Sequence, residues 1–200
     1  MRYGTVENLS ITAASRRVSL ATGHTARPAV HHREAEPSDT GLVMKTIDVE
    51  IRSLERREAE LLLSNHHTGR MAFAFHDRIT IELVNYVYAD GWIYARIEHG
   101  PALTTLQHHQ WVAFEVDELK TVYDWRAVTV HGSVQFLSDD RASPEWRDFN
   151  KATALIREQV PSVLTAEDPL PNRNQLYRIH IDELFGRESR SSGAPQLPAP

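Results

Sequence analysis

The feature that most constrains this chain is a long β-rich segment near its centre. Residues 79–90 read ITIELVNYVYAD and residues 92–98 read WIYARIE. Both stretches are rich in β-branched and aromatic residues, and the Asp90-Gly91 pair between them is typical of a tight hairpin turn. The sequence therefore predicts two antiparallel strands that are joined at Gly91.

Other short β-rich segments lie close to this hairpin on both sides. We expect further strands at RMAFAF (70–75), WVAFEVDEL (111–119), RAVTVHGSVQFL (126–137) and QLYRIHIDELFG (175–186), and a short helix at PALTTLQHHQ (101–110). Many short strands with close turn signals are typical of a β-barrel. The fold class predicted is therefore mainly β, with a few flanking helices.

One helix is expected before the strands and one between the last two. Residues 48–69, DVEIRSLERREAELLLSNHHTG, predict a helix that ends at Gly69 as a left-handed cap. Ser143 and Pro144 predict the start of the second helix, and Pro161 its end. One face of that helix carries the apolar residues Trp146, Phe149, Ile156 and Val160.

The two ends of the chain differ from this middle part. Residues 1–43 hold Ser, Thr, His and Arg without apolar periodicity, which predicts a disordered extension. A basic, acid-poor transit segment is the alternative, and Met44 is an alternative start. We expect one domain over residues 44–187 and a disordered tail over residues 188–200.

Charge and composition narrow the classes of function. The formal net charge of -5 argues against binding of nucleic acid through phosphate contacts. The absence of cysteine excludes disulfides, thiolate catalysis and cysteine zinc sites. No apolar run is long enough to span a membrane, so we expect a cytoplasmic protein without membrane partners. Arginine far outnumbers lysine, 19 to three, so an anion site would use arginine.

The histidines do not predict a metal site. His66-His67 and His108-His109 are adjacent pairs, and neighbouring residues on a helix point about 100° apart. No His-Glu-x-x-His or comparable spacing occurs. We therefore expect no bound metal ion.

Five segments together resemble the pyridoxamine 5'-phosphate oxidase-like superfamily of FMN-binding split β-barrels, in the branch with nitroimidazole-resistance proteins. These segments, spread over residues 46–187, are TGRMAF, LVNYVYADGWIYARIEHG, WVAFEVDEL, DWRAVTVHGSVQFL and YRIHIDELFGR. The resemblance implies a six-stranded split barrel that forms a homodimer. It also implies two flavin sites at the dimer interface, each built from both chains.

The resemblance implies that the strand and turn within residues 92–106 hold the FMN phosphate. The family pattern has a basic residue, a Ser or Thr, and then Gly-x-Lys-Leu. Here Arg96 and Leu103 match, whereas Ile97 replaces the hydroxyl and Ala102 replaces the lysine. His99 is a further donor that we expect to compensate. The alternative for Arg96 is a surface charge on a half-exposed strand.

Two other pairs of residues match the cofactor-binding segments of the family. Asn85 and Tyr86 fall where the family runs along the isoalloxazine ring, and Trp125 and Arg126 fall where it has Trp-Arg-Ser-Val. The serine of that motif is replaced by Ala127. The alternatives are a strand residue and a core aromatic for the first pair, and a core or dimer-interface tryptophan for the second.

The leading hypothesis is an FMN-dependent oxidoreductase that moves two electrons to or from a small organic substrate. No residue is identified as catalytic, because the flavin carries the chemistry in such sites. Loss of the lysine and a hydroxyl would cost about 3–5 kcal/mol of phosphate binding. The alternative is therefore a non-catalytic split barrel that binds deazaflavin, haem or no cofactor, with His99 and His131 as haem candidates. A purely structural dimer is a third reading.

Overall fold

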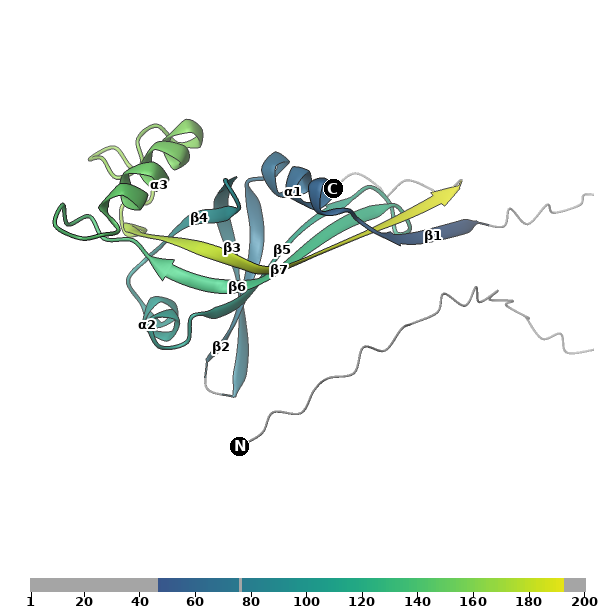
Figure 1. Cartoon of the computed structure of the whole chain (residues 1–200), viewed down its shortest axis with the longest axis horizontal. Coiled ribbons are helices and arrows are strands. Elements are labelled where there is room, and N and C mark those ends of the chain that lie inside the picture. Colours follow the sequence, from purple (N-terminus) through teal and green to yellow (C-terminus); the bar gives the residue numbers. More distant parts are fainter. Residues whose placement is uncertain (1–46, 76, 193–200) are drawn as a thin grey trace, which may run out of the picture. The chain divides into compact units, whose positions relative to one another are not determined.

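The computed structural model describes residues 47–75 and 77–192, which form seven strands and three helices (Figure 1). Every strand predicted from the sequence is present, and so are the helices expected after residue 100 and before Pro161. In chain order the elements are β1 (Asp48–Ser53), α1 (Arg56–Asn65), β2 (Thr68–Phe75), β3 (Arg78–Ala89), β4 (Trp92–Ile97), α2 (Pro101–His108), β5 (Trp111–Leu119), β6 (Trp125–Phe136), α3 (Trp146–Gln159) and β7 (Gln175–Ser192).

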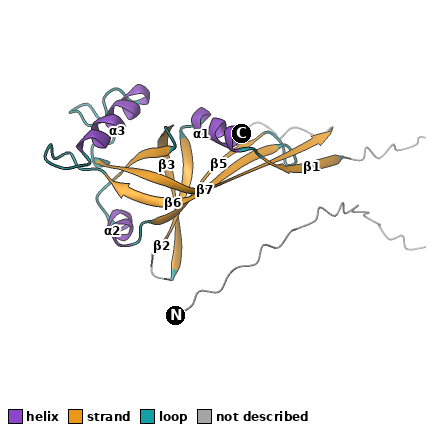
Figure 2. Ribbon diagram, viewed as in Figure 1, coloured by secondary structure: helices purple, strands orange, loops and turns teal. Residues whose placement is uncertain are grey.

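Six of these strands close into a barrel (Figure 2). The order is β7-β4-β3-β2-β5-β6, and antiparallel pairing of β6 with β7 completes the ring. The 18 residues of β7 make this possible, because β7 pairs with β4 at its start, with β6 along most of its length and with β1 at its end. This mainly antiparallel barrel confirms the predicted split-barrel fold.

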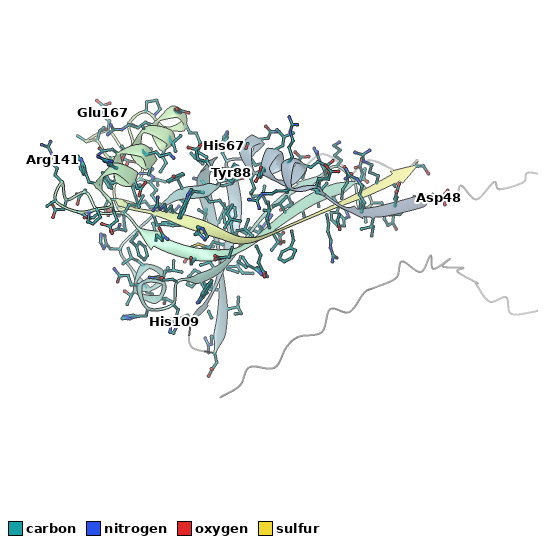
Figure 3. The ribbon with its side chains drawn as sticks, in the orientation of Figure 1. Asp48, His67, Tyr88, His109, Arg141 and Glu167 are labelled. Carbon is teal, nitrogen blue, oxygen red and sulfur yellow. The ribbon has the colours of Figure 1, made fainter. Side chains whose placement is uncertain are left out.

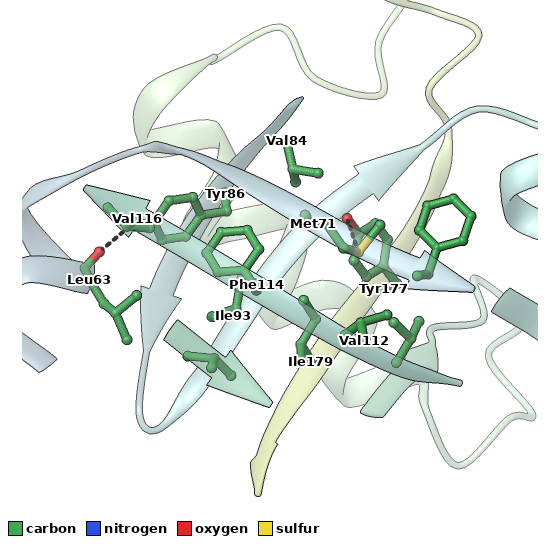
Figure 4. Close-up of a cluster of buried hydrophobic side chains, with 14 of the residues drawn as sticks. Leu63, Met71, Val84, Tyr86, Ile93, Val112, Phe114, Val116, Tyr177 and Ile179 are labelled. Atoms are coloured by element: carbon green, nitrogen blue, oxygen red, sulfur yellow. Dashed lines mark hydrogen bonds between the residues drawn. The ribbon is translucent and has the colours of Figure 1, made fainter. Parts of the chain in front are cut away.

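The barrel interior is filled by large side chains from the inward row of each strand (Figure 4). Tyr86, Phe114 and Tyr177 are almost fully buried, and the rings of the first two meet edge to face at 5.0 Å. Each buried hydroxyl has a partner: Tyr86 donates to the carbonyl oxygen of Leu63 at 2.8 Å, and Tyr177 to the sulfur of Met71 at 3.8 Å. Burial raises the pKa of both tyrosines, so both remain protonated donors.

A second, smaller core lies on the outer side of β4, under α3. Tyr94 of β4 and Leu176 of β7 are buried there against Ala152 and Ile156 of α3. These two residues are four apart and therefore share one face of the helix.

Among the described residues, no helix combines the length and the apolar character needed to cross a bilayer.

The central hairpin has the predicted turn. Asp90 and Gly91 adopt φ values of 50° and 79°, and Ala89 pairs with Trp92 across the turn. Positive φ at both central residues is what a two-residue hairpin turn of the favoured hand requires. The turn sets the register of β3 and β4, and so fixes which residues of β4 face the barrel.

The prediction of the first helix is wrong at both ends: the helix begins later than expected, and Gly69 is not its C-terminal cap. Residues 48–53 form β1 because they pair with the end of β7, and α1 begins only at Arg56. The Glu58 carboxylate accepts the Glu55 amide N–H at 2.8 Å, which stabilises that start. Gly69 lies in β2 and does not cap the helix; a Cβ there would lie 2.4 Å from the ring of Phe114.

Two other predicted boundaries are also wrong. The helix expected to begin at Ser143 and Pro144 begins at Trp146, after a turn in which the Ser143 hydroxyl donates to the Glu145 carboxylate. Residues 188–192 were expected to belong to a disordered tail, but they form the end of β7, which pairs there with β1. The predictions for residues 1–43 and 193–200 lie outside the described residues.

Candidate functional site

Strand β4 separates the barrel interior from the side of the molecule that carries α3. Ile93, Ala95 and Ile97 point into the barrel core, whereas Tyr94 packs under α3. Because side chains alternate along a strand, Arg96 also points to the α3 side. The arginine predicted to bind phosphate therefore faces away from the barrel interior.

Arg96 is held by a carboxylate from a distant loop. Its Nη1 lies 2.5 Å from Oδ2 of Asp168, and the two side chains are only 10% and 1% exposed. Asp168 also accepts the amide N–H groups of Leu164 and Leu170, at 2.8 and 2.9 Å. The hydrogen bond from Arg96 outweighs the effect of burial and lowers the pKa of Asp168 to about 2. Arg96 is thus an anchor for this loop.

The turn between β4 and α2 presents backbone amide groups to its surroundings. Pro101 is the first residue of α2, and no side chain caps this end of the helix. The first amides of a helix have no intrahelical acceptor, so the N–H groups of Ala102 and Leu103 are directed outward from the helix start. His99 is exposed in the same turn. Such a helix start favours an anion, and a phosphate in particular.

Four other predicted residues, on β3, β4 and α2, have packing roles. Tyr86, Ile97 and Leu103 are buried in the barrel core, and Ala102 packs against that core. Asn85 is exposed on the outer face of β3, where its Oδ1 accepts the Thr68 hydroxyl at 3.4 Å. The burial of Tyr86 agrees with the alternative reading of this residue as a core aromatic.

A large cavity of about 770 Å³ lies between this turn and α3. Its apolar lining includes the aromatic side chains of Phe136, Trp146 and Phe149. Arg141 in the β6–α3 loop and Glu167 in the α3–β7 loop, both labelled in Figure 3, lie at the end of the domain opposite Asp48. The polar lining residues are His99, Ser138, Asp139, Asn150, Thr153, Arg157, Asn174 and Gln175. The cavity is large enough for a nucleotide-sized ligand.

A smaller cavity of about 280 Å³ lies at the other end of β6 and holds the second predicted pair, Trp125 and Arg126. The Nε of Arg126 donates to Glu118 at 3.0 Å, and Nε2 of His66 lies 2.8 Å from the other oxygen of that carboxylate. Partial burial works against ionisation of Glu118, but the hydrogen bonds from His66 and Arg126 outweigh it and lower its pKa. Arg126 is therefore already paired within the chain.

The nine predicted residues do not all line either of these two cavities, which are formed by described residues. His99 lines the larger cavity, Trp125 and Arg126 line the smaller one, and the remaining six line neither. A site assembled from two subunits would draw on separate regions of each chain. That arrangement stays a prediction.

Three residues of this region were not identified from the sequence as site residues. The sequence predicts only that Asp168 lies in a loop. An acidic residue followed by a proline is a common pattern, so it does not identify Asp168 as the partner of Arg96. Trp146 and Phe149 were identified as one apolar helix face. Their half-exposed rings line the cavity together with Leu164 and Asn174 of the loop after α3, and no local sequence pattern encodes that arrangement.

The described residues contain no cluster of three or more potential metal ligands among His, Cys, Asp and Glu side chains. His131, one of the haem candidates, is exposed on β6, where its Nδ1 lies 3.1 Å from the Glu183 carboxylate. His99, the other candidate, lies in the β4–α2 turn. The two histidines therefore come from different parts of the barrel.

Comparisons with known proteins agree with this architecture. An FAD-binding protein from Mesorhizobium loti is 23% identical and superposes with a TM-score of 0.58, covering 69% of this chain and 97% of its own. A protein assigned to 5-nitroimidazole antibiotic resistance from Bacteroides thetaiotaomicron is 12% identical, with a TM-score of 0.57 and coverages of 80% and 96%. An FAD and heme binding protein from Mycobacterium smegmatis is 15% identical, with a TM-score of 0.53 and coverages of 72% and 75%.

These structural similarities show the fold alone, because each of the three proteins is less than 25% identical to this chain. A comparison with curated proteins finds no match. The sequence pattern of the family described as pyridoxamine 5'-phosphate oxidase, however, matches residues 55–188, which is well over half of the chain and spans α1 to β7. The chain therefore belongs to the pyridoxamine 5'-phosphate oxidase family of split barrels, as its sequence motifs predicted.

Proposed function

We propose that the protein is a homodimeric flavin-binding oxidoreductase that moves two electrons to or from a small organic substrate. The observation that carries the proposal is the β4–α2 turn, where an uncapped helix start and the exposed His99 form a place for a phosphate. Family membership and the flavin-binding proteins of the same fold support it. FMN is the smallest flavin that carries a phosphate group for this turn to bind.

The donors available for the phosphate differ from those expected from the sequence. Arg96 already pairs with the Asp168 carboxylate. Its guanidinium would therefore bind a phosphate only if it bound the carboxylate and the phosphate at the same time. The amide groups of Ala102 and Leu103 and the imidazole of His99 are better placed to act alone. The site fits a phosphate, but with fewer charged donors than a turn that carries a lysine.

A bound flavin would supply the redox chemistry itself. The part of this chain is to bind and orient the ring, with Asn85 at the outer face of β3 as the proposed polar contact. The buried neighbours Tyr86 and Ile97 hold β3 and β4 in place behind that surface. Rigid strands behind a binding surface keep its polar groups in position.

The proposed dimer would form through the outer face of β3. Ile79, Ile81 and Leu83 point outward at alternate positions and are 69%, 67% and 64% exposed, in the same row as Asn85. Trp111 of β5 is 72% exposed, and the pairing of β3, β2 and β5 places it on the same side of the sheet. Contiguous exposed apolar surface of this kind marks an interaction site. A second copy would bury it next to Asn85.

The first experiment is an absorbance spectrum of the purified full-length protein, followed by titration with FMN. Flavin bands, or saturable binding that His99→Ala weakens, would support the proposal. His109→Ala is the matched control, because His109 is an equally exposed histidine just past the end of α2. Folded protein that binds no flavin would overturn the proposal.

The dimer is tested separately by sedimentation at micromolar concentration. Ile81→Asp should shift the protein toward monomer, because a charge would be buried in the interface. Val122→Asp, at a 65% exposed position in the β5–β6 turn, should leave the mass unchanged. A wild-type protein that sediments as a monomer would contradict the dimer but not flavin binding.

The second candidate is a binding protein that holds haem, deazaflavin or no cofactor and does not catalyse electron transfer. Two observations favour it: Ala102 stands in the place of the lysine, and Arg96 is engaged by Asp168. The similarity to a protein that binds both FAD and heme supports the haem version. A Soret band in the purified protein, in place of flavin bands, would select it.

A further inference from the structure

We propose that the free edge of β1 pairs with β1 of a second copy of the chain, antiparallel and across a twofold axis at Ile51. β1 stands at one end of the strand order, and within the described residues it pairs only with β7. It lies at the end of the domain opposite α3 (Figure 1). An exposed strand edge readily accepts a further strand. The inference is independent of the proposed function, because it concerns neither the flavin site nor the outer face of β3.

The backbone of β1 directs hydrogen-bonding groups to its free edge at alternate residues. Just after β1, the amide N–H of Leu54 donates to the Gly186 carbonyl oxygen of β7 at 2.9 Å. In an antiparallel pair, residues that bond to the neighbouring strand alternate with residues whose N–H and C=O groups point away from it. Counting back in steps of two, Arg52 bonds to β7, whereas Ile51 and Val49 direct their N–H and C=O groups to the free edge.

β1 lacks several features that commonly protect an edge strand from pairing. Its sequence, DVEIRS, contains no proline and no lysine, and its pairing with β7 over Asp48–Ser53 is continuous, without a bulge. The outward-directed residues Val49 and Ile51 are also 42% and 64% exposed. The free edge therefore offers both backbone groups and apolar side chains to a partner strand.

The charges of β1 favour one register for two antiparallel copies. With the twofold axis at Ile51, Glu50 of each copy lies opposite Arg52 of the other, and no like charges meet. With the axis at Glu50 or at Arg52, that residue would face its own charge in the second copy. With the axis at Val49, Asp48 would lie opposite Glu50. Like charges directly opposite one another destabilise a strand pair, so the axis at Ile51 is preferred.

Both members of the Glu50–Arg52 pair have capacity for it. Glu50 makes no hydrogen bond or ion pair with any described residue. Arg52 binds Glu58 through Nη1 and Nη2, both at 2.8 Å, and its Nε donates to no acceptor in the described part of the chain. Exposed ion pairs contribute little, so these pairs select the register more than they strengthen it. One strand pair is also smaller than a stable interface, so we expect association only well above micromolar concentration.

The chain has no cysteine, so a single introduced thiol tests the register. Ile51→Cys places two thiols opposite one another, at the Cα separation of about 5.5 Å that a disulfide can span. Val49→Cys is the matched control, because it lies opposite Ser53 and its two copies are about 13 Å apart along the strands. On oxidation at high protein concentration, we expect at least about tenfold more disulfide-linked chain pairs from Ile51→Cys.

Ile51→Pro tests the backbone hydrogen bonds. Because the Ile51 N–H points away from β7, proline there keeps the β1–β7 pairing and removes both hydrogen bonds at the twofold axis. Association measured by sedimentation over a range of concentrations should weaken about 10- to 100-fold. Both experiments use Ile81→Asp as the background, so that pairing through β3 does not contribute.

Three results would overturn the inference. The first is equal crosslinking of the two cysteine variants, which would mean that β1 has no defined partner register. The second is no crosslinking in folded protein whose Ile51→Cys thiol still reacts with a small maleimide. The third is association of Ile51→Pro that equals that of its background protein. Selective crosslinking at position 51 together with weaker association of Ile51→Pro would support it.

Discussion

The two faces of β4 make different kinds of contact: apolar packing on the inner face and an ion pair on the outer face. The inner face, with Ile93, Ala95 and Ile97, is buried among other apolar side chains and contributes only packing. The outer face places Arg96 against Asp168, whose carboxylate also organises a loop through two backbone amides. The inner face therefore stabilises the barrel, whereas the outer face ties β4 to the loop after α3 through a buried ion pair.

The largest effect is expected from the inner face. Ile93→Ala removes a fully buried side chain and should lower the free energy of unfolding by about 2–5 kcal/mol, measured by urea denaturation at a fixed protein concentration. Ile51→Ala, at a 64% exposed position on β1, is the matched control and should cost less than about 0.5 kcal/mol. Equal costs for the two variants would contradict the packing role of the inner face.

A smaller effect is expected when a positive charge is placed in the first turn of α2, which follows β4. Ala102→Lys should tighten flavin binding by about 1.5–3 kcal/mol, the contribution of one charge-assisted hydrogen bond. Gln107→Lys adds the same charge on an exposed position toward the end of α2 and should change the affinity much less. If both lysines act alike, general electrostatic attraction explains the gain and the turn is not the phosphate site.

The pH dependence of stability tests the Arg96–Asp168 pair. The pKa of Asp168 is about 2 in the folded protein and near 3.8 when unfolded, so its contribution is present above pH 4. It should be lost as the pH falls from about 4 to 2, with a decrease of about 1–2 kcal/mol in the free energy of unfolding. Asp168→Asn should flatten this part of the curve, whereas Glu167→Gln, at the exposed neighbouring position, should not.

The smallest effect is expected where α3 is tied to the hairpin by a surface ion pair. Lys151 lies 2.8 Å from Asp90, and both side chains are at least 40% exposed. Lys151→Ala should change the free energy of unfolding by no more than about 1 kcal/mol. A larger loss, measured by the same urea denaturation, would mean that this contact contributes more to docking of α3 than the buried residues beneath it.

The barrel was predictable from the sequence because its determinants are local. Alternation in β3 and the Asp90-Gly91 turn fix a hairpin without reference to the rest of the chain. The misplaced start of α1 has the opposite cause. Residues 48–53 are a strand only because the end of β7, more than 130 positions later, pairs with them. Such pairing leaves no signal within the segment itself.

The candidate site was less predictable than the fold. Arg96 and the β4–α2 turn follow from the family pattern, but the 72-residue separation between Arg96 and Asp168 hides their contact from any local reading. The aromatic cavity depends in the same way on how the loop after α3 folds back. Family motifs locate the strands of the candidate site, and tertiary contacts decide which of their side chains are free to bind a ligand.

The length and position of β7 have a consequence for how the protein is made. β7 is synthesised after all the other strands that the structure describes, yet it pairs with β1, β4 and β6. Until it emerges from the ribosome, β4 and β6 each keep one unpaired edge, and an unpaired edge is a template for association with other chains. The nascent chain is therefore most prone to aggregate just before β7 emerges, and ribosome-stalled chains that lack β7 should need chaperones most.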